Sequence, residues 1–266
     1  MKILFPVICF LTTLLNADVI TVSTSAPENR CLEVYYRLPA GWNRESGIMI
    51  LFGGRNWSGR ETLSKYRFEA FADKYNLILL SPSFVNDDYW EPEKWSGRAL
   101  FTAVRILEKK LNLKRKKMLY YGYSAGGQCA VLFYAYAPER VLAFGAHACG
   151  VYFDARKWKA HVPALITCGT EDSERLAISR NFIYGYRESG GSLIWKSYPM
   201  GHALQSGPLE IAQAFFGSIL ENAPVRFVGE DDSGLCYPAG EKENVDVEFR
   251  NPLPEGRLLQ LWRLGG

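Results

Sequence analysis

The sequence predicts an α/β fold in which helices cover both faces of a mostly parallel central sheet, followed by a short β-rich extension. Short apolar runs recur along the first 221 residues, and segments with helical periodicity separate them. After Asn222 the pattern changes to brief polar and apolar alternation with turn-forming residues. The 266 residues are 48% hydrophobic and 22% charged, which is the composition of a globular protein with a sizeable core.

The first predicted strand covers residues 31–39, where apolar side chains alternate with polar ones as in a half-buried strand. Continuous apolar runs then predict strands buried on both faces at 48–52, 77–80, 118–121, 141–144, 164–167 and 193–195. Helical periodicity predicts helices around 99–111, 128–136 and 211–219. Because strands and helices alternate along the chain, the sheet is expected to be mostly parallel.

The chain divides into a main domain, residues 18–221, and an extension, residues 222–266. Residues 225–228 and 246–249 alternate like short antiparallel strands, with turns expected at 231–234 and at Asn251-Pro252. The extension is too short to form an independent domain, so it is expected to pack on the main one.

Residues 1–17 are predicted to be a cleaved export signal. Lys2 precedes an apolar run from Ile3 to Leu15 that is too short to span a bilayer, and the small residue Ala17 suits the cleavage site. The mature protein would begin at Asp18 and be secreted or periplasmic. The alternative is a retained N-terminal membrane anchor, and no later segment is apolar for long enough to cross a membrane.

Charge and cysteine content exclude several classes of function. The formal net charge is only +3, which argues against a nucleic-acid partner. Cys9 belongs to the predicted signal; of the other five cysteines, Cys31 and Cys236 are the pair that could form a disulfide. The remaining three lie in apolar surroundings, and neither a CxxC motif nor a zinc-type spacing is present. The sequence therefore implies no metal and no organic cofactor.

One motif carries the chemistry. The predicted strand 118–121 runs into Gly122-Tyr123-Ser124-Ala125-Gly126-Gly127, and the helical segment 128–136 follows. This is G-x-S-x-G between a buried strand and a helix, the context of a nucleophile elbow, in which glycines relieve crowding around a serine lifted above the sheet. Ser124 is therefore predicted to be a nucleophile.

A serine hydroxyl needs a base to attack at neutral pH, and the chain has three histidines. In hydrolases with this elbow, the acid and the histidine follow the serine along the chain. His161 precedes the strand 164–167 and would lie at the wrong end of the sheet, whereas His202 follows the strand 193–195. His202 is the predicted base, and His147 is expected to be a core or pocket-wall residue.

The acid is expected in the loop after the strand 164–167, which offers three carboxylates. Asp172 is preferred because its short side chain, three residues past Gly169, can reach the histidine. Glu171 and Glu174 more naturally begin the next helix, where they favour its N-terminal dipole.

An oxyanion hole normally uses the backbone N–H of the residue after the nucleophile and one from an earlier strand end. Ala125 supplies the first. Gly54, which follows the strand 48–52, is predicted to supply the second, with Arg55 as the alternative donor. Arg55, Trp57 and Tyr123 adjoin these positions and are the predicted substrate-binding residues.

The segments Gly122–Gly127, Gly169–Asp172 and Gly201-His202 together resemble the α/β-hydrolase superfamily, over about Cys31 to Leu220. The most similar layout is that of secreted single-domain esterases of the polyhydroxybutyrate depolymerase, feruloyl esterase and dienelactone hydrolase type. Where many of these have His-Gly at the oxyanion strand end, this chain has Phe52-Gly53. The resemblance implies the α/β-hydrolase fold and no particular substrate.

We therefore expect an exported serine hydrolase that cleaves a small-molecule or polymer-attached carboxylic ester through an acyl-enzyme, using Ser124, His202 and Asp172. A serine peptidase with the same triad is the first alternative. A carbohydrate- or surface-binding module that has lost the chemistry is the second. The sequence leaves the acyl group, the alcohol and the oligomeric state open.

Overall fold

The computed structural model describes residues 17–24, 30–85, 88–158 and 161–264. The predicted signal, apart from Ala17, lies outside them. The main domain contains an eight-stranded sheet with the order β1-β2-β4-β3-β5-β6-β7-β8. Its strands are β1 Asp18–Ser23, β2 Cys31–Arg37, β3 Gly47–Phe52, β4 Leu77–Pro82, β5 Met118–Tyr123, β6 Val141–His147, β7 Ala164–Gly169 and β8 Leu193–Tyr198.

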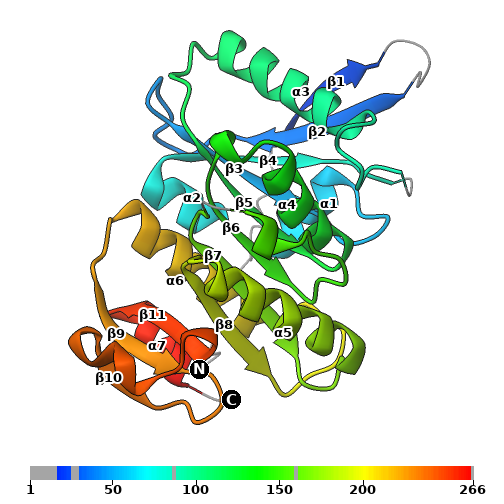
Figure 1. Cartoon of the computed structure of the whole chain (residues 1–266). Coiled ribbons are helices and arrows are strands. Elements are labelled where there is room, and N and C mark those ends of the chain that lie inside the picture. Colours follow the sequence, from blue (N-terminus) through cyan, green and yellow to red (C-terminus); the bar gives the residue numbers. More distant parts are fainter. Residues whose placement is uncertain (1–16, 25–29, 86–87, 159–160, 265–266) are drawn as a thin grey trace, which may run out of the picture.

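The expectation of a mostly parallel sheet is confirmed. Neighbouring strands from β4 through β8 pair in parallel, whereas β1 pairs antiparallel with β2, and β2 pairs antiparallel with β4. Strand β1, which the apolar pattern does not predict, completes one edge of the sheet (Figure 1). Parallel strands end on the same edge of a sheet, so the loops after β3, β5, β6, β7 and β8 lie together.

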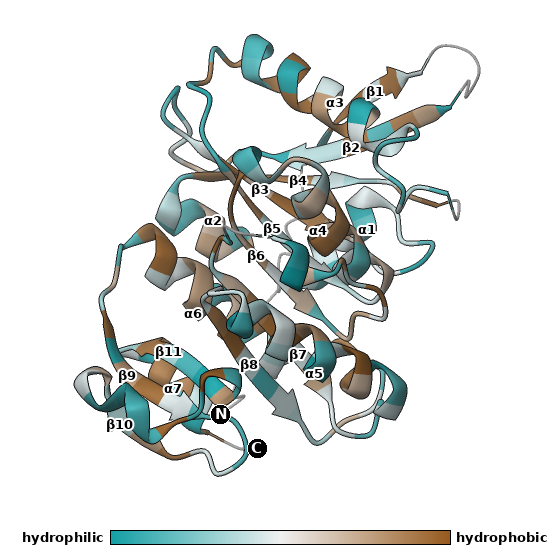
Figure 2. Cartoon of the chain, viewed as in Figure 1, coloured by the Kyte–Doolittle hydropathy of each residue, from teal (hydrophilic) through white to brown (hydrophobic). Residues whose placement is uncertain are grey.

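Helices cover both faces of the sheet. They are α1 Gly59–Tyr66, α2 Glu69–Tyr75, α3 Ser96–Lys110, α4 Ala125–Tyr136, α5 Ser173–Glu188 and α6 Ser206–Leu220, with short 3₁₀ turns at Pro138–Arg140 and Ala155–Lys157. On one face the Tyr121 ring contacts Tyr66 at the end of α1 and Phe216 of α6. On the other, Phe144 contacts Tyr134 of α4 and Tyr186 of α5. Apolar residues are concentrated in the strands between these layers (Figure 2).

The extension forms a small antiparallel sheet, with strand order β10-β9-β11, and a helix. Its elements are β9 Val225–Glu230, β10 Cys236–Pro238, 3₁₀ turns at Ala239–Asn244 and Val247–Phe249, β11 Arg250–Pro254 and α7 Arg257–Arg263. The expectation of a strand at 246–249 is wrong, because Val247–Phe249 form a 3₁₀ turn. The expectation of a turn at Asn251-Pro252 is also wrong, because both residues lie within β11. Proline is tolerated there since β11 is an edge strand of this sheet.

The extension packs on the outer edge of β8 (Figure 1). The Trp195 N–H donates to Asn251 Oδ1 at 2.6 Å, and the Trp195 carbonyl accepts from Trp262 Nε1 at 2.8 Å. Lys196 Nζ donates to the Trp262 carbonyl at 2.7 Å. Side chains thus satisfy backbone groups that an open strand edge would leave available for pairing with another chain.

The disulfide suggested by the sequence is not formed. Cys31 begins β2 of the large sheet and Cys236 begins β10 of the small one, and both are free. Cys129, Cys149 and Cys168 are free and buried, as their apolar surroundings indicate. Across the described ranges, no helix combines the length and the apolar character needed to cross a membrane.

Candidate active site

Ser124 occupies a strained turn between β5 and α4. Its backbone has φ 55° and ψ −121°, a conformation that L-residues rarely adopt, and its N–H donates to the His147 carbonyl at 2.9 Å. A Cβ on Gly122 would lie 2.0 Å from the Gly126 carbonyl oxygen, and one on Gly126 would lie 1.9 Å from the Phe52 carbonyl oxygen. The elbow therefore needs glycine at both positions, since the backbones approach too closely for any side chain.

The structure brings Ser124, His202 and Asp172 together in one chain of hydrogen bonds. Ser124 Oγ lies 2.9 Å from His202 Nε2, and His202 Nδ1 lies 2.7 Å from Asp172 Oδ2. An ionised carboxylate only accepts, so Nδ1 carries the proton and Nε2 is free to accept from the serine hydroxyl. The Asp172 side chain is 6% exposed and that of His202 is 33% exposed, so the imidazole is within reach of solvent.

Two touching loops hold the acid against the histidine. The Thr170 N–H donates to the Tyr198 carbonyl at 2.8 Å, and the Glu171 N–H donates to the Met200 carbonyl at 3.1 Å. A Cβ on Gly169 would lie 2.1 Å from the Met200 carbonyl oxygen, so this close approach requires glycine. Glu171 and Glu174, the other two carboxylates of the loop, are exposed.

Arg175 contacts the candidate acid and is absent from the expectations drawn from the sequence. Its Nη1 donates to Asp172 Oδ1 at 3.1 Å, so each oxygen of the carboxylate accepts a hydrogen bond from a different partner. The sequence feature that could have predicted this contact is the spacing: Arg175 follows Asp172 by three residues, in the first turn of α5. The two bonds together restrict rotation of the carboxylate group.

The two predicted oxyanion donors lie where the end of β3 meets the start of α4. Ala125 is the first residue of α4, so its N–H has no partner within the helix. The close approach of Gly126 to the Phe52 and Gly53 carbonyls places the loop containing Gly54 against this helix start. Gly54 itself is buried and packs on Trp57 and Tyr123.

The three predicted substrate-binding residues differ in exposure. Arg55 is exposed and Trp57 is half-buried, and Lys65 Nζ lies 3.8 Å from the centroid of the Trp57 ring. Tyr123 is only 8% exposed, and its hydroxyl donates to the His202 carbonyl at 3.2 Å. Its ring packs on Trp57, His147 and His202, so the contact of Tyr123 with substrate stays a prediction.

His147 is fully buried, at the end of β6. Its Nε2–H donates to the Ala203 carbonyl at 2.8 Å, and its Nδ1 accepts from Thr167 Oγ1 at 2.9 Å. Burial lowers the pKa of His147 to about 4, so the ring stays neutral near pH 7. The sequence indicates its burial but not its contact with the loop that carries His202.

This lowered pKa predicts a loss of stability in acid. The unfolded chain takes up a proton at His147 below its ordinary value of 6.5, whereas the folded protein does so only near 4. The free energy of unfolding should therefore fall between about pH 6.5 and pH 4, and the full difference corresponds to about 3 kcal/mol. Urea unfolding of the wild type and of His147→Gln across this range measures it.

His147→Gln should show a shallower pH dependence than the wild type. The pKa of His161 is also lowered by burial, but that residue is present in both proteins and its contribution cancels in the comparison. Equal slopes for the two proteins would contradict the assignment to His147.

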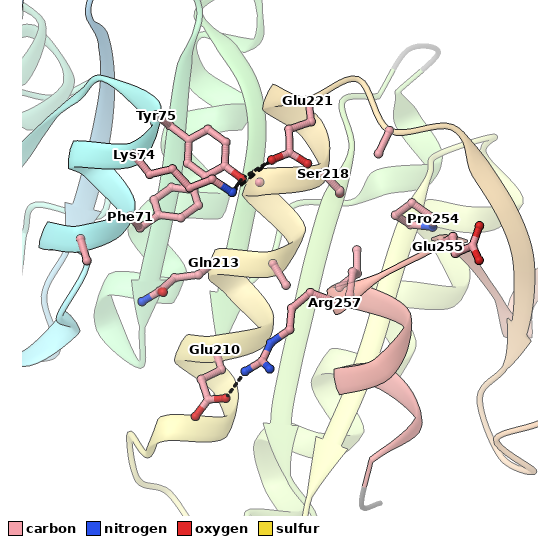
Figure 3. A pocket seen from close by; sticks show the side chains of 15 residues that line it. Phe71, Lys74, Tyr75, Glu210, Gln213, Ser218, Glu221, Pro254, Glu255 and Arg257 are labelled. Atoms are coloured by element: carbon pink, nitrogen blue, oxygen red, sulfur yellow. Dashed lines mark hydrogen bonds and ion pairs between the residues drawn. The ribbon is translucent and has the colours of Figure 1, made fainter. Parts of the chain in front are cut away.

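A hollow of about 410 Å³ lies away from this site, between α2, α6 and the start of α7 (Figure 3). The Glu221 carboxylate accepts from Tyr75 Oη at 2.5 Å and pairs with Lys74 at 3.3 Å, while Arg257 pairs with Glu210 at 3.0 Å. These charged groups are exposed and neutralise one another. These two ion pairs lie in the lining of the hollow, which also includes Glu255.

No cluster of three or more His, Cys, Asp or Glu residues that could hold a metal ion is found in the part of the chain that the structure describes.

Comparisons with known proteins identify the fold. No family model and no curated protein matches the sequence. Among solved structures, a poly(3-hydroxybutyrate) depolymerase from Bordetella parapertussis aligns with 86% of this chain and 94% of its own, at TM-score 0.56 and 15% identity. A ferulic acid esterase aligns with 77% of this chain and 95% of its own, at TM-score 0.57 and 14% identity.

A thermostable esterase aligns with 70% of this chain at TM-score 0.54 and 14% identity, and the chain spans 55% of its length. At these identities the likeness concerns the fold alone. The strand order, the helices on both faces and these neighbours together show that the chain has the α/β-hydrolase fold. The resemblance to α/β-hydrolase esterases is thereby confirmed at the level of the fold.

Proposed function

We propose that this protein is a serine hydrolase that cleaves carboxylic esters through an acyl-enzyme. The observation that carries the proposal is the hydrogen-bonded chain from Ser124 Oγ through the His202 ring to Asp172, with distances of 2.9 and 2.7 Å. Both fall within the range expected of a nucleophile, its base and the group that orients the base.

The geometry suits acyl transfer in two halves. His202 Nε2 takes the proton of Ser124 Oγ as the oxygen attacks the ester carbonyl, and the N–H groups of Ala125 and Gly54 stabilise the oxyanion. The protonated imidazole then gives its proton to the departing alkoxide, which leaves as an alcohol. A water molecule attacks the acyl-enzyme with His202 again as base, and the carboxylic acid is released from Ser124.

Two observations favour an ester substrate. The structural neighbours include proteins described as esterases and a poly(3-hydroxybutyrate) depolymerase. The hydrogen bond between Ser124 and His202 is exposed, which suits a small-molecule or polymer-attached ester that approaches from solvent.

We also propose that residues 1–17 direct export, leaving a secreted or periplasmic protein, with retention as an N-terminal anchor as the alternative. The basic residue, the apolar run and Ala17 support cleavage before Asp18. Strand β1 begins at Asp18, whose carboxylate accepts from Tyr36 Oη at 3.0 Å, so a chain cut there would keep its first strand. Sequencing of the mature N-terminus tests this, and a retained Met1 would contradict it.

Reaction with a fluorophosphonate tests the nucleophile directly. Peptide mass spectrometry should locate the adduct on Ser124, and the protein should hydrolyse short-chain or feruloyl p-nitrophenyl esters. Ser124→Ala should lose both properties. Hydrolysis of peptide amides in preference to esters would favour the peptidase, and absence of both labelling and hydrolysis would favour the binding module.

Ser189→Ala is the matched control, because Ser189 also contacts a histidine. His161 Nε2 lies 2.8 Å from Ser189 Oγ. The Ser189 hydroxyl, however, donates its proton to the Gly185 carbonyl at 2.7 Å and not to the histidine. His161 Nδ1 has no hydrogen-bond partner in the described structure, so this pair lacks an acid. Ester hydrolysis by Ser189→Ala should equal that of the wild type.

A further inference from the structure

Tyr123 and His147 lie side by side at the ends of neighbouring strands. They are register partners in the parallel pair β5 and β6, and their ring centroids are 5.6 Å apart at an interplanar angle of 25°. The Tyr123 ring also stacks on His202, with centroids 5.2 Å apart at 29°. Tyr123 therefore stands between the buried histidine and the candidate base.

The two side chains hold consecutive carbonyl groups of the loop that carries His202. Tyr123 Oη donates to the carbonyl of His202 itself at 3.2 Å. His147 Nε2–H donates to the carbonyl of Ala203 at 2.8 Å. The loop also has a short-range bond from Ala203 N–H to the Gly201 carbonyl at 2.9 Å and accepts from the Glu171 N–H of the acid loop, whereas these two contacts tie its backbone to β5 and β6 of the sheet.

His147 also contacts the segments that carry the nucleophile and the acid. Its carbonyl accepts from the N–H of Ser124 at 2.9 Å. Its Nδ1 accepts from Thr167 Oγ1 at 2.9 Å, and Thr167 lies on β7, which leads into the loop of Asp172. One buried residue thus connects the segments that carry the nucleophile, the base and the acid.

We propose that His147 and Tyr123 are positioning residues that place His202 relative to Ser124 and Asp172. The proposal rests on the proposed function. A displacement of about 1 Å in a catalytic group can lower the rate of the chemical step about 10²-fold. Losing either contact should therefore lower kcat much more than it alters KM, because both contacts hold the backbone of the loop that carries the base.

Three variants test the proposal through ester hydrolysis. Tyr123→Phe keeps the ring and removes its hydroxyl, and His147→Phe keeps a flat ring and removes both nitrogens. Each should lower kcat about 10- to 100-fold and change KM less than about threefold. His147→Gln should recover most of the loss, because its amide nitrogen can donate to the Ala203 carbonyl in place of Nε2.

Two matched controls remove similar groups near the start of β7, at the opposite end of the parallel strands from the candidate site. Tyr186 Oη donates to the Val162 carbonyl at 2.5 Å, just before β7 begins, and the His161 ring lies 4.2 Å from the Tyr186 ring at an interplanar angle of 42°. Tyr186→Phe and His161→Phe should lower stability without changing kcat more than about twofold, since neither residue contacts the segments that carry Ser124, His202 and Asp172. The same kcat loss in the controls would show a general structural effect and overturn the proposal.

Proton NMR gives a readout that does not depend on turnover. The downfield resonance of His202 Nδ1–H, assigned by its loss in His202→Ala, reports the bond to Asp172. It should shift or broaden in Tyr123→Phe and His147→Phe and stay unchanged in the two controls. If the wild type hydrolyses no ester, the proposed function fails, whereas this resonance still decides the positioning role. An unchanged resonance with unchanged kcat would overturn the proposal.

Discussion

Replacing His202 with alanine should lower kcat for ester hydrolysis by about 10⁵-fold, with little change in KM. The imidazole is the only group that contacts Ser124 Oγ and Asp172 together, at 2.9 and 2.7 Å, in the described structure. Without it the serine hydroxyl keeps its proton at neutral pH and attacks slowly. Rapid-quench and steady-state kinetics with a p-nitrophenyl ester measure the loss.

Asp172→Asn should have a smaller effect of about 10⁴-fold. The amide can donate to His202 Nδ1 and so favours the tautomer that carries its proton on Nε2, which cannot accept from the serine. Arg175 would lose its carboxylate partner in the same variant, so Arg175→Met is needed to separate the two contributions.

The losses of activity in Ser124→Ala, His202→Ala and Asp172→Asn should not be additive. Groups that act as one unit lose nearly all their effect when any one is removed, so Ser124→Ala combined with His202→Ala should resemble either single variant. His161→Ala, outside the site, should retain full activity. Losses that multiply across the double variant would contradict a single catalytic unit.

Replacing Asp231 with alanine should lower the free energy of unfolding by about 3–5 kcal/mol. Asp231 pairs with Arg187 at 2.6 Å, and both side chains are 2% exposed. Removal of the carboxylate leaves the guanidinium buried without its counter-charge, and Asn251 Nδ2 also loses the oxygen it contacts at 2.6 Å. Asn251 holds the edge of β8, so the extension should detach from the main domain more readily.

The neighbouring residue provides the control. Asp232 pairs with Arg180 at 3.0 Å, but the two side chains are 56% and 34% exposed. Asp232→Ala should therefore cost less than about 1 kcal/mol, as expected for an ion pair in contact with solvent. Urea unfolding of both variants measures the difference. A similar, small loss in the two would show that the buried pair does not hold the extension in place.

Local patterns along the chain were sufficient to predict strands β2 through β8 of the central sheet. The apolar runs identify strands β3 through β8 because strands buried on both faces need continuous apolar residues, and this requirement is local. Three of the six residues of strand β1 are polar, so its apolar pattern is weak, and its pairing with β2 identifies it. Asn251 and Pro252 suggest a turn, but the packing of β11 against β8 overrides that preference.

The sequence by itself determined strands β2 through β8, helices α3, α4 and α6, the elbow at Ser124 and the loops of the acid and the base. Each of these depends on residue types at fixed spacing along a short segment, which is information that the chain carries locally. The arrangement of the candidate site was decided elsewhere. The bond between Asp172 and His202, the contact of Arg175 with Asp172, and the contacts of His147 and Tyr123 with the His202 loop join segments far apart in the chain or depend on side-chain direction. Only the tertiary structure decides such contacts, because they follow from how the strands align in the sheet and how closely the loops pack.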